Sequence, residues 1–493
     1  MASTINLSRN TKLYFTTNVN STSGAIITDT AVGTFTSANT IQIPVLDGFS
    51  FSQATTQSTI QISEAGDTPS RGQRAFNTAL NPVEFSFSTY IRSSLTAAIG
   101  PVSAVEKVLW NALMGEATID ATGLAPTSIG RADATTAVAS IVAPSPLSKV
   151  VNGATTRLGI NDIINVTGAT ETSYNQPARI TAAPTGAGAS TPFTGSTTYT
   201  VEYSIAPSST ATSATVTAAK IYSGQWAQGS TGTAATDFSY VSTMGANKNQ
   251  LQKFGLIFVV DTVVYGIDNC ALDQASIAFG LDSIAMCAWT GKGTALNKLT
   301  VPTAATLATA YTANAVTAAN KASYITNKLS TVTLTANIGG GGSAYVIPIT
   351  GGNLTINNNI VYQTPTNLAV VNQPIGYYTG QRAISGNVTA YLRTGDSGNL
   401  DAGGLLSQLL TDKTTSVEPK FFVRLEMGGK SALNRVEFEM PAAVLQIPAV
   451  NIADVVATTI NFNAQGFAAD KSSFDVTGNN ELIIRYFSNT STA

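Results

Sequence analysis

The chain contains no histidine among its 493 residues. Histidine is the commonest general base, so this absence excludes Ser-His-Asp and Cys-His catalytic sites as well as Cys/His zinc sites. Charged residues make up only 11% of the chain, whereas an average soluble domain has about 25%. A surface with few charges suits large subunit contacts, because the centres of interfaces are depleted of charge. The formal net charge of −2 creates no basic field that would recruit nucleic acid.

Cysteines and long apolar runs are also scarce. Cys270 and Cys287 are too few to cross-link a chain of this length, and we expect both to be buried free thiols in a protein folded in a reducing cytosol. The first residues lack a basic segment followed by an apolar core, so we expect no signal peptide. The longest apolar run, 254–260, ends at Asp261 and is far too short for a membrane span.

No motif for catalysis or ligand binding is present. Residues 290–294 superficially resemble a phosphate-binding loop, but Gly293 stands where Ser or Thr must follow the lysine. No calcium loop with alternating acidic residues is visible. Glu437 and Glu439 form a pair of carboxylates, which on one face of a strand is more typical of a solvated surface than of a glycosidase site. We therefore expect no catalytic residue, cofactor or metal, and predict a structural protein rather than an enzyme.

The sequence repeats itself in a constant order. Residues 43–48 (IPVLDG) match 347–352 (IPITGG), Lys253-Phe254 matches Lys420-Phe421, and two strands with alternating apolar residues end in matching Tyr-Ile/Leu-Arg peptides. The polar faces of both strands carry the tyrosine and the arginine. A shift of one residue would have exchanged the two faces, so this shared pattern indicates a duplicated domain.

A helical pattern follows each repeated strand. In the first copy, Ser103 and Glu106 have the spacing of a capping box, and Gly115 follows the apolar stripe. In the second copy, a shorter stripe covers residues 405–410. We expect each helix to cover one open side of a sheet.

The copies differ after the helix, where the first contains an insertion. Residues 117–247 are expected to form an inserted β module with a core at about 148–222 and flexible Ala/Thr/Ser/Gly-rich flanks. Its short strands between turn residues resemble the immunoglobulin-like modules that decorate phage virions. The first copy would then comprise residues 1–116 and 248–293, residues 294–327 would be a linker, and the second copy would cover 328–493. The predicted fold is all-β with minor α.

Residues 59–64, 71–76, 82–92 and 281–291 resemble the major tail tube proteins of tailed bacteriophages. The resemblance covers the chain apart from the insert and the linker. It implies two tail-tube β-sandwich domains, each flanked by a helix. In this family six domains form a ring around a channel, so a fused double domain implies homotrimeric, pseudo-sixfold rings. The rings would stack into a helical tube that conducts DNA from the capsid to the host.

The resemblance also implies partners and a location. The expected partners are further copies of the chain, the tape measure, terminator and baseplate or tip proteins, and a sheath where the tail contracts. Double-stranded DNA would pass through the lumen without sequence-specific binding, and no membrane is involved. Assembly would take place in the bacterial cytoplasm and place the protein in the virion tail.

Two sets of residues are candidates for this function. A lysine-rich wall would bind phosphates, so the channel face should be acidic or neutral, and we assign Glu426, Glu437 and Glu439 to it. Arg71, Arg74 and Arg382 are expected at contacts between subunits, with solvated loop charge as the alternative. A secreted surface-layer-like protein and a virion decoration protein remain alternative functions; the expected lack of a signal peptide argues against the former.

Overall fold

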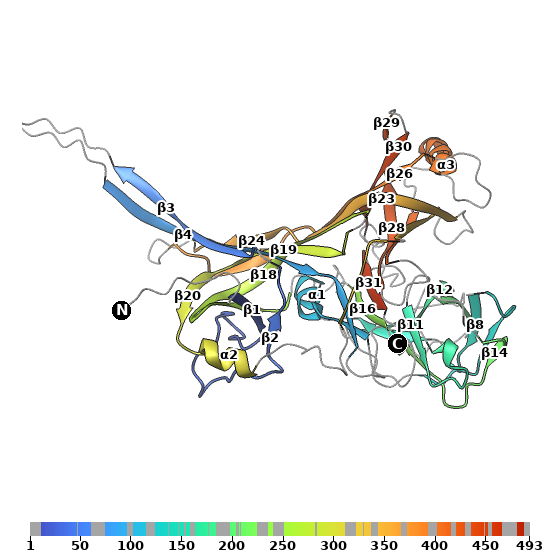
Figure 1. Ribbon diagram of the computed structural model, residues 1–493, viewed down its shortest axis with the longest axis horizontal. Coiled ribbons are helices and arrows are strands. Elements are labelled where there is room, and N and C mark those ends of the chain that lie inside the picture. The colour runs from blue at the N-terminus through green and yellow to red at the C-terminus, as the bar shows by residue number, and fades with distance from the viewer. Residues whose placement is uncertain are drawn as a thin grey trace, which may run out of the picture.

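The structure, a computed structural model, describes most of the chain between residues 11 and 487. The described residues are 11–46, 48–60, 74–95, 102–114, 124–136, 138–145, 147–151, 154–157, 163–175, 177–183, 198–203, 207, 209–223, 235–239, 251–281, 283–310, 322–328, 330–336, 344–365, 372–392, 402–415, 421–428, 435–447, 449–451, 456–465 and 481–487. Strands predominate in these residues, and the predicted all-β fold with minor α is confirmed (Figure 1).

The strands of the first copy pair in a closed circuit. They are β1 (Thr11–Thr16), β2 (Thr40–Ile43), β3 (Ser50–Ile60), β4 (Arg74–Tyr90), β17 (Phe254–Val260), β18 (Val263–Gly280) and β19 (Met286–Gly293). From β1 the circuit runs through β17, β18, β19 and β4 to β3, and β2 then returns to β1. All these pairs are antiparallel, so the circuit forms two layers around one core.

The second copy repeats this circuit with one strand fewer. Its strands are β22 (Thr331–Ala336), β23 (Ala344–Asn357), β26 (Ala383–Tyr391), β27 (Phe421–Met427), β28 (Arg435–Leu445) and β30 (Ala457–Ala464). From β22 the circuit runs through β27, β28, β30 and β26 to β23, which pairs again with β22. The single strand β23 therefore replaces β2 and β3.

The repeated peptide lies at the same corner of both circuits. Residues 43–48 join β2 to β3, and residues 347–352 contain the irregularity at which β23 passes from one layer to the other. A Cβ atom on Gly352 would lie 2.2 Å from the carbonyl oxygen of Asn387 and 2.8 Å from the ring of Phe279. The close approach of backbone and ring at this corner thus requires a glycine.

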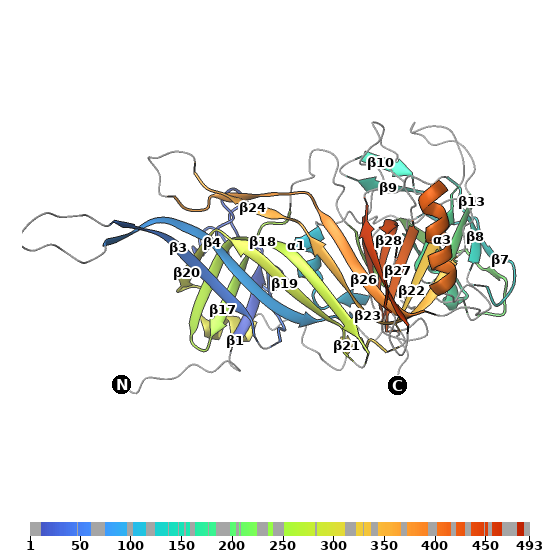
Figure 2. The same cartoon turned by 90° about the horizontal axis from the view of Figure 1, so that it is seen from above.

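One sheet runs through both copies, because β18 pairs directly with β23. Their register extends from Gln274 opposite Asn357 to Gly280 opposite Gly351. The resulting order is β3, β4, β19, β18, β23, β26 and β30 (Figure 2). The buried apolar residues of both copies accordingly form one continuous core, which includes Trp289, whose indole N–H donates to Thr89 Oγ1 at 2.9 Å.

A helix packs on each copy, as expected. Helix α1 (Lys107–Met114) buries Leu109, Trp110 and Leu113, and helix α3 (Ala402–Thr415) buries Leu405 and Leu409. The expected capping box is wrong, because Ser103 lies in strand β6 (Val102–Ala104). The Glu106 carbonyl accepts the first helical hydrogen bonds, and the Glu106 side chain is buried.

The C-terminal strand β31 (Ile483–Phe487) ties the copies together. It pairs with β28 and with β16 (Ala235–Ser239). The hydroxyl of Tyr486 donates to Glu106 Oε1 and accepts from the Trp110 indole N–H at 2.8 Å. Trp110 in turn packs edge-on against Trp289, with ring centroids 4.7 Å apart. A residue from the end of the chain therefore lies in the core of the first copy.

The insert forms a separate sheet with its own core. The sheet order is β14 (Ser213–Ala214), β7 (Ser128–Arg131), β8 (Val138–Val142), β13 (Thr198–Tyr203), β12 (Pro177–Ala182), β11 (Ile163–Thr167) and β15 (Lys220–Ser223). Strands β9 (Ser148–Val151) and β10 (Ala154–Arg157) form a separate hairpin, and a 3-10 turn covers Thr172–Tyr174.

The expected flexible flanks and linker are partly wrong. Strands β7 and β8 precede residue 148 yet belong to the insert's sheet, because buried Arg131 fixes β7 through bonds to Tyr174 and to several carbonyls. Within 294–327, β20 (Ala295–Leu299) pairs with β18, and β21 (Ala322–Tyr324) pairs with β5 (Arg92–Leu95). Helix α2 (Ala304–Ala310) buries Leu307 against the first copy.

Glu106 should make stability depend on pH. Burial raises its pKa from 4.5 to about 7, although the Tyr486 hydroxyl and Arg92 act in the opposite direction. The folded state therefore holds a proton that the unfolded state releases between these pH values, and stability falls as pH rises through this window, by about 3 kcal/mol. Glu106→Gln should remove this loss, which urea titrations at pH 5 and pH 8 would measure. An equal pH slope in wild type and variant would contradict the assignment.

Candidate functional site

The sheet shared by both copies has an apolar face and a polar face. Alternate residues of a strand point to opposite faces, so in β26 Ile384 and Val388 enter the core while Asn387 and Thr389 remain partly exposed on the other side. The same alternation occurs in β4, β19, β23 and β30. We call the polar side the ladder face, because its residues lie opposite one another from strand to strand.

Three rows of backbone partners cross the ladder face. The first contains Ser86, Thr290, Gln274 and Asn357; the second Ser276, Thr355, Ser385 and Asn463; the third Ala278, Asn353, Asn387 and Asn461. Ser86 shares a hydrogen bond of 2.9 Å with Ser50, and the Asn461 amide donates to Gln446 Oε1 at 3.2 Å. These rows present hydroxyl and amide groups almost throughout.

The charges near the ladder face oppose one another. Glu84 and Lys292 are direct partners in the register of β4 and β19. Asp273 lies at the irregularity of β18, where its carboxylate accepts the Ile360 N–H at 2.7 Å. No cluster of potential metal ligands occurs among the described residues. The ladder face can therefore hydrogen-bond water over its whole width, but it offers little fixed charge to a polyanion.

The assignment of Glu426, Glu437 and Glu439 to a channel face is wrong. All three side chains are buried in the single chain, with relative exposures of 2%, 0% and 0%, together with Arg424 and Arg435. They lie on β27 and β28, in the layer opposite the ladder face. On these strands the apolar residues face the core, and the charged residues face the other side, which is buried as well. The sequence pattern had suggested that this other side is solvated.

These five residues form a charge network, the charged cluster. The Arg435 Nε donates to Glu437 Oε1 at 3.1 Å, and Arg424 Nε lies 3.9 Å from Glu426 Oε1. In the register of β27 and β28, Arg424 is opposite Glu439 and Glu426 is opposite Glu437. Two neighbouring carboxylates thus depend on the arginines, because buried charges require partners.

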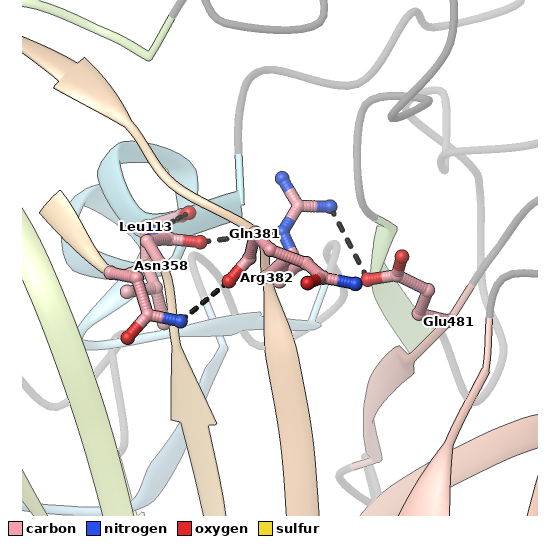
Figure 3. Close-up of polar contacts among 6 residues, drawn as sticks. Leu113, Asn358, Gln381, Arg382 and Glu481 are labelled. Carbon is pink, nitrogen blue, oxygen red and sulfur yellow. Dashed lines mark hydrogen bonds and ion pairs between the residues drawn. The ribbon is translucent and has the colours of Figure 1, made fainter.

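The three predicted contact arginines differ in their surroundings. Arg71 lies outside the described residues, and Arg74 is exposed at the start of β4. Arg382 instead forms an ion pair with Glu481 at 3.7 Å, and its Nε donates to Asn358 Oδ1 at 3.3 Å (Figure 3). Burial raises the pKa of Glu481, while Arg382 lowers it. Arg382 therefore joins segments of one chain, and its assignment to a subunit contact stays a prediction.

Arg74 and Arg382, which match in the sequence repeat, differ in position because their strands differ in length. The strands end at corresponding tyrosines, Tyr90 and Tyr391, yet β4 has 17 residues and β26 has nine. Arg74 and Arg382 consequently occupy different places. The additional residues of β4 belong to a hairpin with β3 that projects from the body of the molecule (Figure 1).

The ladder face itself was not recognised from the sequence. Its signal is present in the uncharged polar residues at alternate positions of 353–357, 385–389 and 459–463. That signal does not distinguish a functional face from an ordinary solvated one, because only the pairing of β18 with β23 joins the two copies' faces into one surface.

The geometry defines a β-rich protein. Among the described residues, no helix is long and apolar enough to cross a membrane. No family model matches the sequence. The chain is 25% identical over 474 residues to "Tail tube protein pb6" of Escherichia phage T5, covering 90% of this chain and 74% of that protein. This similarity supports the predicted role as a structural, non-enzymatic tail tube protein located in the virion tail.

A solved structure of the anti-feeding prophage baseplate, symmetrised sixfold, is also similar in part. It matches 28% of this chain and 89% of its own chain, at 10% identity and a TM-score of 0.22. This partial overlap carries no argument, so the assignment as a tail tube protein rests on the relative from phage T5.

The charged cluster should be sensitive to the loss of one member. Arg435→Met removes the Nε that donates to the buried Glu437 carboxylate and should lower the free energy of unfolding by about 3–5 kcal/mol. The double variant Arg435→Met/Glu437→Leu removes both charges and should lose less than half as much. Urea unfolding followed by tryptophan fluorescence measures both values. A double variant as unstable as the single one would show that the ion pair is not the cause.

Proposed function

We propose that three copies of this chain close into a pseudo-sixfold ring whose ladder face lines a channel. The rings stack into a helical tube, through which double-stranded DNA passes from the capsid to the host without sequence-specific binding. The observation that supports this proposal is the joint between the two copies, together with the equivalent strands at both ends of the shared sheet.

The joint inside the chain gives a template for the joint between chains. Inside the chain, the second half of β18 pairs with the second half of β23. By position in the duplicated circuit, β3 is equivalent to that part of β23, and the end of β28 with β29 (Ala449–Asn451) is equivalent to that part of β18. In the described residues, the sheet pairing of β3 is to β4 and that of β29 is to β30.

Two complementary edges on one chain favour a closed ring. An exposed strand edge promotes pairing with another chain, and a head-to-tail contact yields a ring when its rotation closes. If β3 of one chain pairs with β28 and β29 of the next, each contact repeats the joint already made by β18 and β23. Three chains then provide six equivalent positions, and the ring has no remaining edge.

The ladder face suits a channel wall for DNA. Positively charged walls would hold phosphates by counterion release, which makes binding strong at low salt. The three rows instead offer hydroxyl and amide groups, and Glu84 lies opposite Lys292. Such a wall keeps its hydration and lets a polyanion pass, so the neutral alternative of our prediction is favoured over an acidic wall.

The hairpin of β3 and β4 provides a contact between rings. Its outer part is exposed on both faces, with Ile60 47% and Phe76 49% exposed. A two-stranded hairpin alone is marginally stable in water, so this arm requires a surface to pack on. We propose the neighbouring ring as that surface. Interactions with other tail proteins follow from the tail tube role, and the tape measure, terminator and baseplate or tip proteins are the proposed partners.

Cysteine cross-linking tests the ring. Gln446 takes the place of Gln274, and Ala54 takes the place of Asn357, which faces Gln274 inside the chain. The double variant Ala54→Cys/Gln446→Cys, treated with a short thiol cross-linker, should give covalent oligomers that stop at the trimer on a denaturing gel. The buried native cysteines should not react, since burial raises the pKa of both thiols.

The matched control is Gln274→Cys/Asn357→Cys, which should cross-link within one chain and leave its mass at that of a monomer. Covalent products that continue beyond the trimer, or a variant that stays monomeric while the control cross-links, would contradict the proposed ring.

Lysines on the ladder face should make the tube retain DNA. Asn387 and Asn461 are neighbours in the register of β26 and β30, and Asn387→Lys/Asn461→Lys places two positive charges per chain on the wall. Assembled tubes of this variant should bind short duplex DNA, with a log–log salt slope steeper by about 0.9 for each additional phosphate that the lysines neutralise. The control Thr217→Lys, at an exposed site of the insert, should leave DNA binding unchanged. Equal binding by both variants would show that the ladder face is not the wall.

A further inference from the structure

The outer layers of the two copies differ in one chemical respect. Strand β17 of the first copy and β27 of the second are equivalent, and both direct alternate residues into the shared core: Phe254, Leu256 and Phe258 in β17, and Phe421, Val423 and Leu425 in β27. The residues between them face away from this core. In β17 these include Ile257 and Val259, whereas in β27 they are Phe422, Arg424 and Glu426.

The first copy covers its outer face with its own apolar segments. Ile257 and Val259 lie in a small second core with Tyr14, Ile26 and Leu307 of helix α2. This cover consists of residues within the first copy or adjacent to it in sequence. A partner of a different kind is needed on the second copy, where charges replace the apolar residues.

The charged residues of the second copy are buried in spite of their charge. Arg424, Glu426, Arg435, Glu437 and Glu439 are each less than one-tenth exposed in the single chain. Burial of an ionised side chain is costly unless charges or hydrogen bonds compensate it. The segment that covers this face must therefore be polar at the contact.

The inserted module offers such a contact on β13. Its Tyr199, Val201 and Tyr203 enter the module's own core, so Glu202 lies on the opposite face of the module's sheet, where it is half-buried. Glu202 acts on Arg424: burial opposes the charge of that arginine, but Glu426, Glu437, Glu439 and Glu202 together raise its pKa. Figures 1 and 2 both show the module beside the second copy.

We infer that the module inserted in the first copy docks on the charged cluster of the second copy, with Glu202 of β13 facing Arg424 of β27. The cluster is thus a built-in docking face for a polar partner that belongs to the same chain. Its opposed charges fix how the module sits, because wrong pairings bring like charges together. The module then connects the copies in addition to the pairing of β18 with β23 and to β31.

This docking also places the module relative to the channel. The charged cluster and the ladder face lie on opposite sides of the second copy's two layers, since Val423 and Leu425 enter the same core as Ile384 and Val388 from the other layer. On the proposed function, on which this step rests, the ladder face points to the lumen. The module therefore lies on the outer surface of the tube.

Charge exchange tests the docking. Glu202→Arg and Arg424→Glu should each raise hydrogen exchange of the β27 and β28 amides by about fivefold or more, since close charge pairs are coupled to that extent. The double variant Glu202→Arg/Arg424→Glu should recover part of the protection that Arg424→Glu alone loses, because opposite charges again face each other at this contact, while the interactions of Arg424 with Glu426 and Glu439 remain lost. The milder Glu202→Gln, which keeps the module's own core, should raise exchange in the same strands.

The matched control is Glu171→Gln. Glu171 also lies on the module and bonds to Thr215 within it. This variant should leave the exchange of β27 and β28 unchanged. A Glu202→Gln variant that behaves like the control, or a double variant no better protected than Arg424→Glu, would overturn the docking. The measurement uses unassembled chains, so a failed docking and a failure to form tubes are distinguishable results.

Discussion

The backbone pairing of β18 with β23 is the interaction on which the rest of the structure depends. It converts two similar sandwiches into one sheet, one core and one polar ladder face. Because the paired strands come from different copies, the contact also shows how equivalent strands meet. In the proposed ring, the edges at the far ends, β3 and β28 with β29, meet in the same way between neighbouring chains. The contact within the chain would then serve as the pattern for the contact between chains.

The two copies share the same circuit of strands but differ in their outer layers and in the length of their strands. The first copy keeps an apolar outer layer, covered by Ile26 and Leu307, and extends β4 into a projecting hairpin. The second copy replaces Ile257 and Val259 by Arg424 and Glu426 and so acquires a polar contact surface. Tyr486 returns to the first copy and hydrogen-bonds with Glu106 and Trp110 in its core. The copies are therefore unequal halves that share one sheet and one core.

Much of the framework was predictable from the sequence. Duplicated all-β domains were indicated by the alternation in 83–92 and 384–393 and by the matching peptides at 43–48 and 347–352. The similarity to the tail tube protein of phage T5 supports the predicted role in a tail tube. The candidate site was predicted poorly. Glu437 and Glu439 alternate with Val436 and Phe438 as they would on a solvated strand, because periodicity reports two faces without saying what covers each. From the sequence, Arg382 likewise has the pattern of a charged loop residue. Its ion pair with Glu481, about a hundred residues away, is visible only in the structure.

The sequence by itself determined the elements, their order and their duplication, since these follow from local side-chain alternation and turn chemistry. It also determined that no histidine-dependent chemistry is available. Only the tertiary structure decided which of the two polar faces of the second copy stays open and which is buried. That choice depends on contacts between residues distant in sequence, such as Gln274 with Asn357 and Tyr486 with Glu106, whose free energies no local pattern encodes.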